Sequence, residues 1–120
     1  MGKRILIVDD AKFMRNILKK ILETAGYTII GEAENADEGI RLYSEKKPDF
    51  VTMDICMPNK SGIEAIKAIK QIDDNANILV CSALGQELLV MEAIQAGAKD
   101  FIVKPFKKEK ILKTVEKLTA

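Results

Sequence analysis

The chain of 120 residues contains no histidine, and this absence excludes several kinds of catalytic and metal site. Without an imidazole there is no Ser-His-Asp triad, no histidine general base and no ordinary zinc site. Cysteine is scarce as well, since Cys56 and Cys81 are the only two and neither belongs to a CxxC pair. This usage does not indicate a disulfide framework, so we expect the protein in the reducing cytoplasm.

The features of membrane, nucleic-acid and nucleotide binding are also missing. The apolar run at residues 5–8 is too short for a signal peptide or a membrane span, so no membrane insertion is expected. A net charge of +1, from 19 basic and 18 acidic residues, argues against a nucleic-acid binder. The glycines form no GxG, and the phosphate-loop spacing of Gly26 and Gly31 lacks the Lys and Ser or Thr that must follow. We therefore expect no nucleotide site.

The composition that remains is that of a globular domain. Hydrophobic residues make up 48% of the chain and charged residues 31%, which excludes disordered and fibrous classes. A chain of this length usually forms one domain, and such a domain buries about two-thirds of its unfolded surface. We expect a single domain over residues 1–120.

Short apolar runs alternate with amphipathic segments along the chain. The runs predict β-strands at residues 5–8, 27–30, 50–53, 78–81 and 101–103. Most of them are continuous, as in parallel strands that helices cover on both faces. The segments between them predict helices at residues 13–25, 36–46, 63–72, 88–96 and 111–118. Five strand–helix units predict a doubly wound α/β fold with (βα)5 topology.

Two surface features leave alternatives open. The helix at 88–96 is apolar on more than one face, which fits either a deeply buried helix or one that keeps apolar surface for a partner. The lysine-rich C-terminal helix presents either a solvated face or a docking surface for an acidic partner helix. Phe13, Met14 and Met57 are expected to be packing residues.

Polar residues follow four of the five predicted strands. They are Asp9 and Asp10 after the first, Asp54 after the third, Ser82 after the fourth and Lys104 after the fifth. The carboxyl ends of parallel strands form one rim of the sheet, where open α/β sheets bind ligands. Each residue alone has an ordinary explanation as a helix cap, a turn residue or a solvated charge. Their convergence on one rim favours a functional site.

The residue types at this rim suit phosphoryl transfer. Three carboxylates repel one another unless a cation lies between them, and oxygen ligands favour a hard ion such as Mg2+. Lys104 supplies a compact positive charge for a phosphate oxygen, and the Ser82 hydroxyl can donate to the same group. Such chemistry depends mostly on positioning and charge neutralisation. The acceptor should be a carboxylate, because no base is present to activate Ser82.

Four segments resemble the receiver domain of two-component response regulators. They read IVDD, MDICMP, CSA and FIVKPF, at residues 7–10, 53–58, 81–83 and 101–106. The likeness extends over residues 3–118. The segments DDAKFMR and AGAKDF are most similar to the stand-alone chemotaxis regulators of that family. The resemblance implies a flavodoxin-like five-stranded parallel sheet with strand order 2-1-3-4-5.

The resemblance also implies a role for each site residue. Asp54 would accept a phosphoryl group from a histidine kinase, and Mg2+ would be held by Asp10, Asp54 and the Cys56 backbone carbonyl, with Asp9 holding a coordinated water. Lys104 would pair with the phosphoryl oxygens or, before modification, with Asp54. Ser82 would move to bond the new phosphate, and Phe101 would rotate inward behind it. The protein would be a signalling protein rather than an enzyme, because it catalyses only its own phosphorylation and dephosphorylation.

The implied partners are a histidine kinase of the chemotaxis type, a flagellar or archaellar motor-switch protein or adaptor, and in some systems a phosphatase. The output partner would bind the face formed by the fourth helix, fifth strand and fifth helix of a monomer. Other functions remain open: a phosphorelay intermediate without a motor target, a regulator cut from a longer DNA-binding protein, and a metal-dependent phosphatase. Phosphatases of that kind carry a DxD pattern after the first strand, whereas in this chain Asp9 and Asp10 are adjacent.

Overall fold

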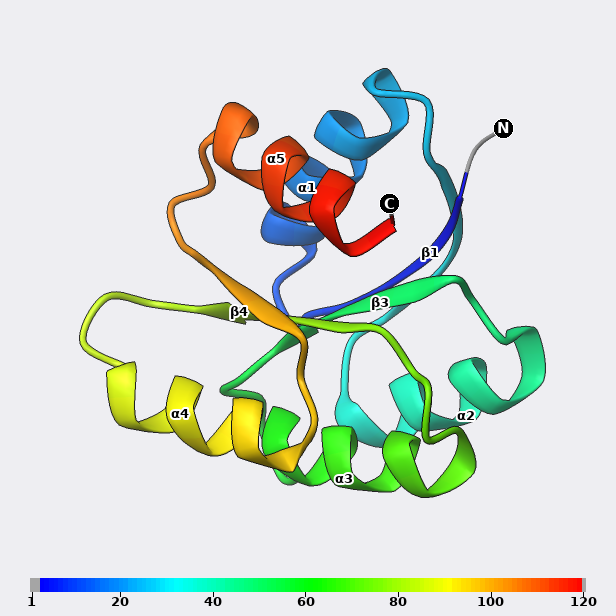
Figure 1. Cartoon of the computed structure of the whole chain (residues 1–120), viewed down its shortest axis with the longest axis vertical. Helices are drawn as coiled ribbons and strands as arrows, with labels where there is room; N and C mark the ends of the chain where they lie inside the picture. Colours follow the sequence, from blue (N-terminus) through cyan, green and yellow to red (C-terminus); the bar gives the residue numbers. More distant parts are fainter. Residues whose placement is uncertain (1–2, 120) are drawn as a thin grey trace.

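The computed structural model describes residues 3–119, in which five strands and five helices alternate along the chain (Figure 1). The expected domain also includes residues 1, 2 and 120, which lie outside the described residues. In chain order the elements are β1 (Arg4–Val8), α1 (Lys12–Thr24), β2 (Thr28–Ala33), α2 (Ala36–Lys46), β3 (Phe50–Asp54), α3 (Gly62–Ile72), β4 (Ile78–Ser82), α4 (Glu87–Ala96), β5 (Asp100–Val103) and α5 (Lys108–Thr119).

The strands form one sheet in the order β2-β1-β3-β4-β5, and every neighbouring pair is parallel. This confirms the predicted doubly wound α/β class and the strand order implied by the resemblance. The order reverses beside β1, because the chain first adds β2 on one side and then crosses to β3 on the other. The gap between the loops after β1 and β3 therefore lies at the carboxyl rim, where such sheets bind ligands.

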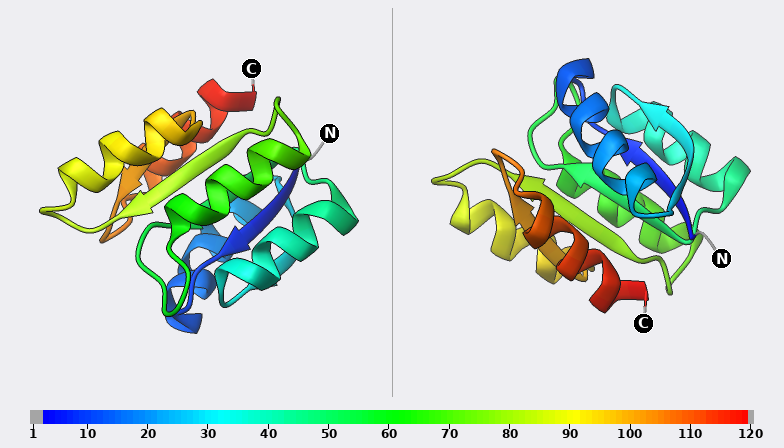
Figure 2. Two further views of the ribbon diagram at one scale, coloured as in Figure 1. Left: turned by 90° about the horizontal axis from the view of Figure 1, so that it is seen from below. Right: turned by 90° about the horizontal axis from the view of Figure 1, so that it is seen from above.

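Helices cover both faces of the sheet. α1 and α5 lie on one face, and α2, α3 and α4 lie on the other (Figures 1 and 2). Each face has its own apolar core, with Leu18 and Ile111 in the first and Ile66 and Ile69 in the second. The strands between these cores must be apolar on both sides, and all residues of β3 and β4 are buried. Burial on two faces explains why these strands are recognisable as continuous apolar runs.

Strand β2 is longer than predicted and is shifted toward the C-terminus. The expected strand was residues 27–30, but the observed strand continues through Gly31 and Glu32 to Ala33. β2 is an edge strand, so a polar side chain can leave the sheet without being buried. Glu32 does so by pairing with Arg15 and Lys19 of α1. A search for continuous apolar runs misses such a strand.

Helix α4 keeps much of its apolar surface exposed. Ala93 is its only buried residue, whereas Leu88 is 77% exposed and Met91 is 58% exposed. The interpretation of a deeply buried helix is therefore wrong, and the expected exposed apolar surface is present; that a partner binds it stays a prediction. No helix in the described part of the chain is both long and apolar enough to span a membrane.

Candidate functional site

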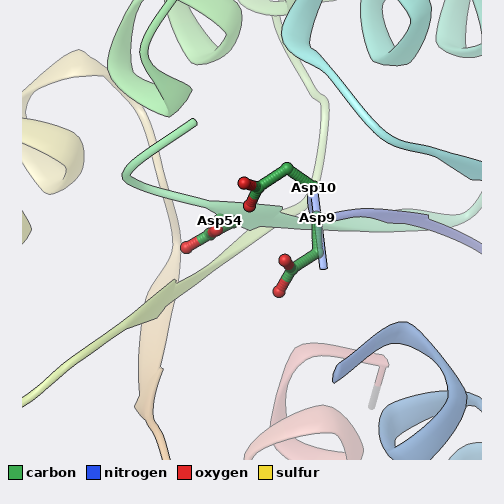
Figure 3. Close-up of side chains that lie close together, drawn as sticks. All are labelled: Asp9, Asp10 and Asp54. Atoms are coloured by element: carbon green, nitrogen blue, oxygen red, sulfur yellow. The ribbon is translucent and has the colours of Figure 1, made fainter. Parts of the chain in front are cut away.

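The three predicted carboxylates meet at the carboxyl rim of the sheet, as Figure 3 shows for Asp9, Asp10 and Asp54. One carboxylate oxygen of each lies within 4.8 Å of the others. Asp9 and Asp10 follow β1, and Asp54 ends β3, which is paired with β1. Asp9 and Asp54 are buried, and Asp10 is exposed.

The backbone after β1 holds Asp9 in place. Its N–H donates to the Ala33 carbonyl at 3.0 Å, and its Oδ1 accepts the Ala11 N–H at 2.9 Å. Arg15 of α1 also donates to the Asp9 carbonyl at 2.6 Å. Neither aspartate caps α1, because its N-cap residue is Ala11 and no side chain bonds the first turn. The capping alternative is therefore wrong.

Asp54 has an unfavourable environment for its negative charge. The residue is only 6% exposed, and burial raises its pKa to about 7. Repulsion from Asp9 adds to this rise in the pKa, and attraction to Lys104 opposes it. Near neutral pH the carboxyl is therefore poised between its two protonation states. A cation at the site would favour the ionised form.

Lys104 reaches into the same cluster from the end of β5, but its closest partner differs from the expected one. Its Nζ lies 2.8 Å from Asp9 Oδ2 and 3.5 Å from Asp54 Oδ1. The side chain is mostly buried, so the solvated-charge alternative is wrong. Although burial lowers the pKa of Lys104, the hydrogen bond to Asp9 and the charge of Asp54 raise it overall. One ammonium thus faces three carboxylates, and the cluster has an excess of negative charge.

The loop between β3 and α3 follows Asp54 directly and contains a backbone carbonyl that no described hydrogen bond uses. The Gly62 N–H donates to the Ile55 carbonyl at 2.8 Å, which folds the loop back toward β3. Ser61 and Glu64 then begin α3 with a reciprocal capping box. Among the described hydrogen bonds, none uses the carbonyl of Cys56. The three carboxylates of the cluster offer oxygen ligands only, which suits Mg2+.

Comparison with known proteins agrees with this geometry. The profile of the response regulator receiver domain matches residues 5–116. The chain belongs to the response regulator receiver family. It is 58% identical to the chemotaxis protein CheY of Thermotoga maritima, over 99% of both chains, and 55% identical to CheY of Bacillus subtilis, over 98% of both. The protein is thus a CheY-like receiver domain, consistent with chemotaxis signalling.

A solved structure of similar shape contains a bound metal and a phosphoryl mimic. It is described as the CheX–CheY–BeF3–Mg2+ complex from Borrelia burgdorferi. The match has a TM-score of 0.93 and 38% identity, and it covers 98% of this chain and 90% of that chain. The likeness confirms the fold across essentially the whole receiver domain.

Ser82 and Phe101 of the receiver domain both line one cavity. Ser82 is buried at the end of β4, and Phe101 is 41% exposed on the neighbouring strand β5. This cavity of about 260 Å3 is also lined by Val90 and Met91 of α4. An apolar cavity of about 150 Å3 is large enough for benzene, so this one can accept a phenylalanine ring.

The sequence interpretation missed two residues that hold the site and misjudged one beside it. Arg15 binds the Asp9 carbonyl, and Gly62 lies against Asp54, where an added Cβ would be 2.1 Å from the Asp54 carbonyl oxygen. For Gly62 the available signal was a glycine directly after the serine that caps α3. Nothing in the sequence indicates the role of Arg15. Phe13 is not a packing residue, because it is 73% exposed at the start of α1. Met57 does pack against the core.

Proposed function

We propose that this receiver domain is a phospho-acceptor switch that is modified on Asp54 by a histidine kinase. One Asp54 oxygen attacks the phosphorus of a phosphohistidine, the P–N bond breaks, and an acyl phosphate forms. The burial of Asp54 among two carboxylates and one ammonium supports this role most directly. Further positive charge would favour the ionised form of this acceptor, so we expect the reaction to be faster when a metal ion is bound.

The residues that would hold Mg2+ are Asp9, Asp10, Asp54 and the Cys56 carbonyl. Their oxygens match the preference of Mg2+ for a few carboxylates together with retained waters. When bound, the ion neutralises charge on the phosphoryl oxygens and on the carboxylates. The exposed position of Asp10 leaves one side of the cluster open to solvent, from which ion and donor can enter.

Lys104 and Ser82 would bind the new phosphoryl group. Lys104 already lies between Asp9 and Asp54, so its ammonium can turn toward a phosphoryl oxygen over a short distance. Ser82 offers a hydroxyl from the neighbouring strand, since Asp54 is paired with Cys81. A charge that appears on Asp54 therefore attracts groups from β4 and β5, the two strands that border the α4 face.

The output would be a change in the face formed by α4, β5 and α5. When Ser82 moves toward the phosphoryl group, the cavity beside it enlarges and Phe101 can rotate inward. Leu88, Met91 and Ile94 of α4 are already exposed, and Met91 lines the same cavity as Phe101. Such a switch shifts the populations of two arrangements and needs no new structure.

The partners that fit this account are a chemotaxis-type histidine kinase and a motor-switch protein or adaptor. Phe101 has no phenolic hydroxyl, so the output contact at β5 would be apolar, and the lysines of α5 favour an acidic partner helix. A phosphatase is a further expected partner, and the Borrelia relative was solved in complex with a second protein, CheX. Transfer of the phosphoryl group back from Asp54 to a histidine phosphotransfer domain would instead favour the phosphorelay alternative.

The test is phosphoryl uptake from phosphoramidate, measured by intact mass with Mg2+ present. We expect one added phosphoryl group on the wild type and none on Asp54→Asn, because an amide is a far poorer nucleophile. Asp74→Asn is the matched control, since Asp74 is exposed just beyond the end of α3, away from the carboxyl rim. Equal uptake by wild type and Asp54→Asn would contradict the proposal.

A further inference from the structure

Gln86 stands at the start of α4 but does not cap it. As the N-cap residue it has no side-chain hydrogen bond to the first turn of the helix. Glutamine is also not among the residues that favour this position. Its amide instead makes two bonds outside the helix: Oε1 accepts the Ala83 N–H at 2.6 Å, and Nε2 donates to Cys56 Sγ at 2.9 Å.

These two bonds connect the loops that carry the site. Because the Ala83 N–H is a donor, the oxygen end of the amide must face Ala83, and the NH2 end is then directed at Cys56. Cys56 lies two residues after Asp54, and Ala83 directly follows Ser82. The Gln86 side chain thus ties the loop after β4 to the loop after β3 across the mouth of the site.

The region around Gln86 has few other restraints. Ala93 is the only residue of α4 that is buried, and Leu84 in the preceding loop is 81% exposed. Gln86 also lines the cavity between Ser82 and Phe101. A displacement of Ser82 toward Asp54 would carry the adjoining Ala83 with it, so the bond from Ala83 to Gln86 would have to break or lengthen.

We propose, presupposing the phosphoryl switch at Asp54, that Gln86 is a positioning residue that holds the loop after β4 in the unmodified arrangement. Its two hydrogen bonds stabilise the arrangement in which Ser82 is withdrawn and Phe101 is exposed. They are lost when the loop moves, so they oppose activation and set how strongly a phosphoryl group must bind to shift the population.

Gln86→Ala removes both bonds from the unmodified state and leaves the phosphoryl ligands in place. Because the bond to the Ala83 N–H and the weaker bond to the Cys56 sulfur are lost from the unmodified state only, the variant should bind a phosphoryl mimic about threefold to tenfold more tightly, which corresponds to about 0.7–1.4 kcal/mol. Gln95→Ala is the matched control, because Gln95 is exposed on the same helix and lines no part of the cavity.

The experiment is a calorimetric titration of wild type, Gln86→Ala and Gln95→Ala with beryllofluoride at saturating Mg2+. Tighter binding by Gln86→Ala, with Gln95→Ala equal to wild type, supports the role of Gln86. Affinity of Gln86→Ala within twofold of wild type, or weaker, overturns it. The exchange rate of the Ala83 amide hydrogen provides a second readout, and it should increase in Gln86→Ala if the bond exists in solution.

Cys56→Ala completes a double-mutant cycle that a purely structural role would not reproduce. Cys56→Ala keeps the backbone carbonyl and removes the Sγ that accepts the Gln86 Nε2–H. If the thiol contributes through this bond, its removal should tighten binding in the wild type and change it less in the Gln86→Ala background. Additive effects of the two substitutions would overturn the coupling. Absence of beryllofluoride binding by the wild type would instead contradict the Asp54 switch itself, whereas normal wild-type binding with an unchanged Gln86→Ala variant contradicts only the role of Gln86.

Discussion

Removing the charge of Asp54 should stabilise the protein when no metal ion is present. The pKa of Asp54 is raised from 3.8 to about 7 by burial and by Asp9. The folded state therefore holds a proton more tightly than the unfolded state does, and stability falls as the pH rises from about 4 to 7. A shift of about three pKa units corresponds to roughly 4 kcal/mol, which solvent access at the rim reduces to about 2–4 kcal/mol.

Asp54→Asn keeps the shape of the neutral acid and should be more stable than the wild type by this amount at pH 8.5. For a chain of this length the unfolding entropy is roughly 0.25 kcal/mol/K, so the melting temperature should rise by about 8–16 °C. At pH 4 the wild-type carboxyl is protonated in the folded state, and the two proteins should melt within a few degrees of each other.

The assay is thermal and urea unfolding followed by far-UV circular dichroism in EDTA, at pH 4 and pH 8.5. Asp74→Asn serves as the control and should match the wild type at pH 8.5, because Asp74 is exposed. Equal stability of wild type and Asp54→Asn at pH 8.5, or a difference that does not depend on pH, would refute the claim that burial and Asp9 disfavour the charged form of Asp54.

Two further predictions concern the metal ion and the loop that borders the site. Mg2+ should raise the melting temperature of the wild type, because a ligand at about 100 times its dissociation constant adds roughly 2.7 kcal/mol to the free energy of unfolding. The rise should be much smaller for Asp54→Asn, which lacks one of the proposed ligands. An equal rise in both proteins would mean that the ion binds elsewhere. Gly62→Ala should destabilise the protein by about 1–3 kcal/mol in urea unfolding, since its Cβ would overlap the Asp54 carbonyl oxygen. Gly31→Ala should lower the free energy of unfolding by less, because the atom nearest to its added Cβ lies at 3.4 Å. The reverse order would contradict the close approach of Gly62 to the Asp54 backbone.

The parts of the fold that were predictable are those in which burial dictates residue type. β3 and β4 are covered on both faces, so their sequences are continuous apolar runs that reveal the strands. The edge strand β2 was misplaced because one side of it is open to solvent and it can carry Glu32. The exposure of α4 was undecided because its apolar residues lie on both sides of the helix: Leu89 and Val90 pack against the core, whereas Leu88 and Met91 are exposed.

The site was predictable because polar residues at strand ends have no structural reason to be grouped in a parallel sheet unless a ligand binds there. The hydrogen-bond partner of each side chain was not predictable. The preference of Lys104 for Asp9 over Asp54 depends on side-chain geometry at the rim. The bridge from Gln86 to Cys56 depends on two loops that meet only after folding.

Coupling between Asp54 and the output face is the central claim, and the position of Phe101 tests it most directly. The four phenylalanines can be labelled with 4-fluorophenylalanine, and the Phe101 signal identified by its loss in Phe101→Leu. We predict that Mg2+ and beryllofluoride move this 19F resonance from a solvent-exposed to a buried environment, leave buried Phe50 unchanged, and have no effect in Asp54→Asn. A Phe101 resonance that stays solvent-exposed while the wild type binds beryllofluoride would contradict the account.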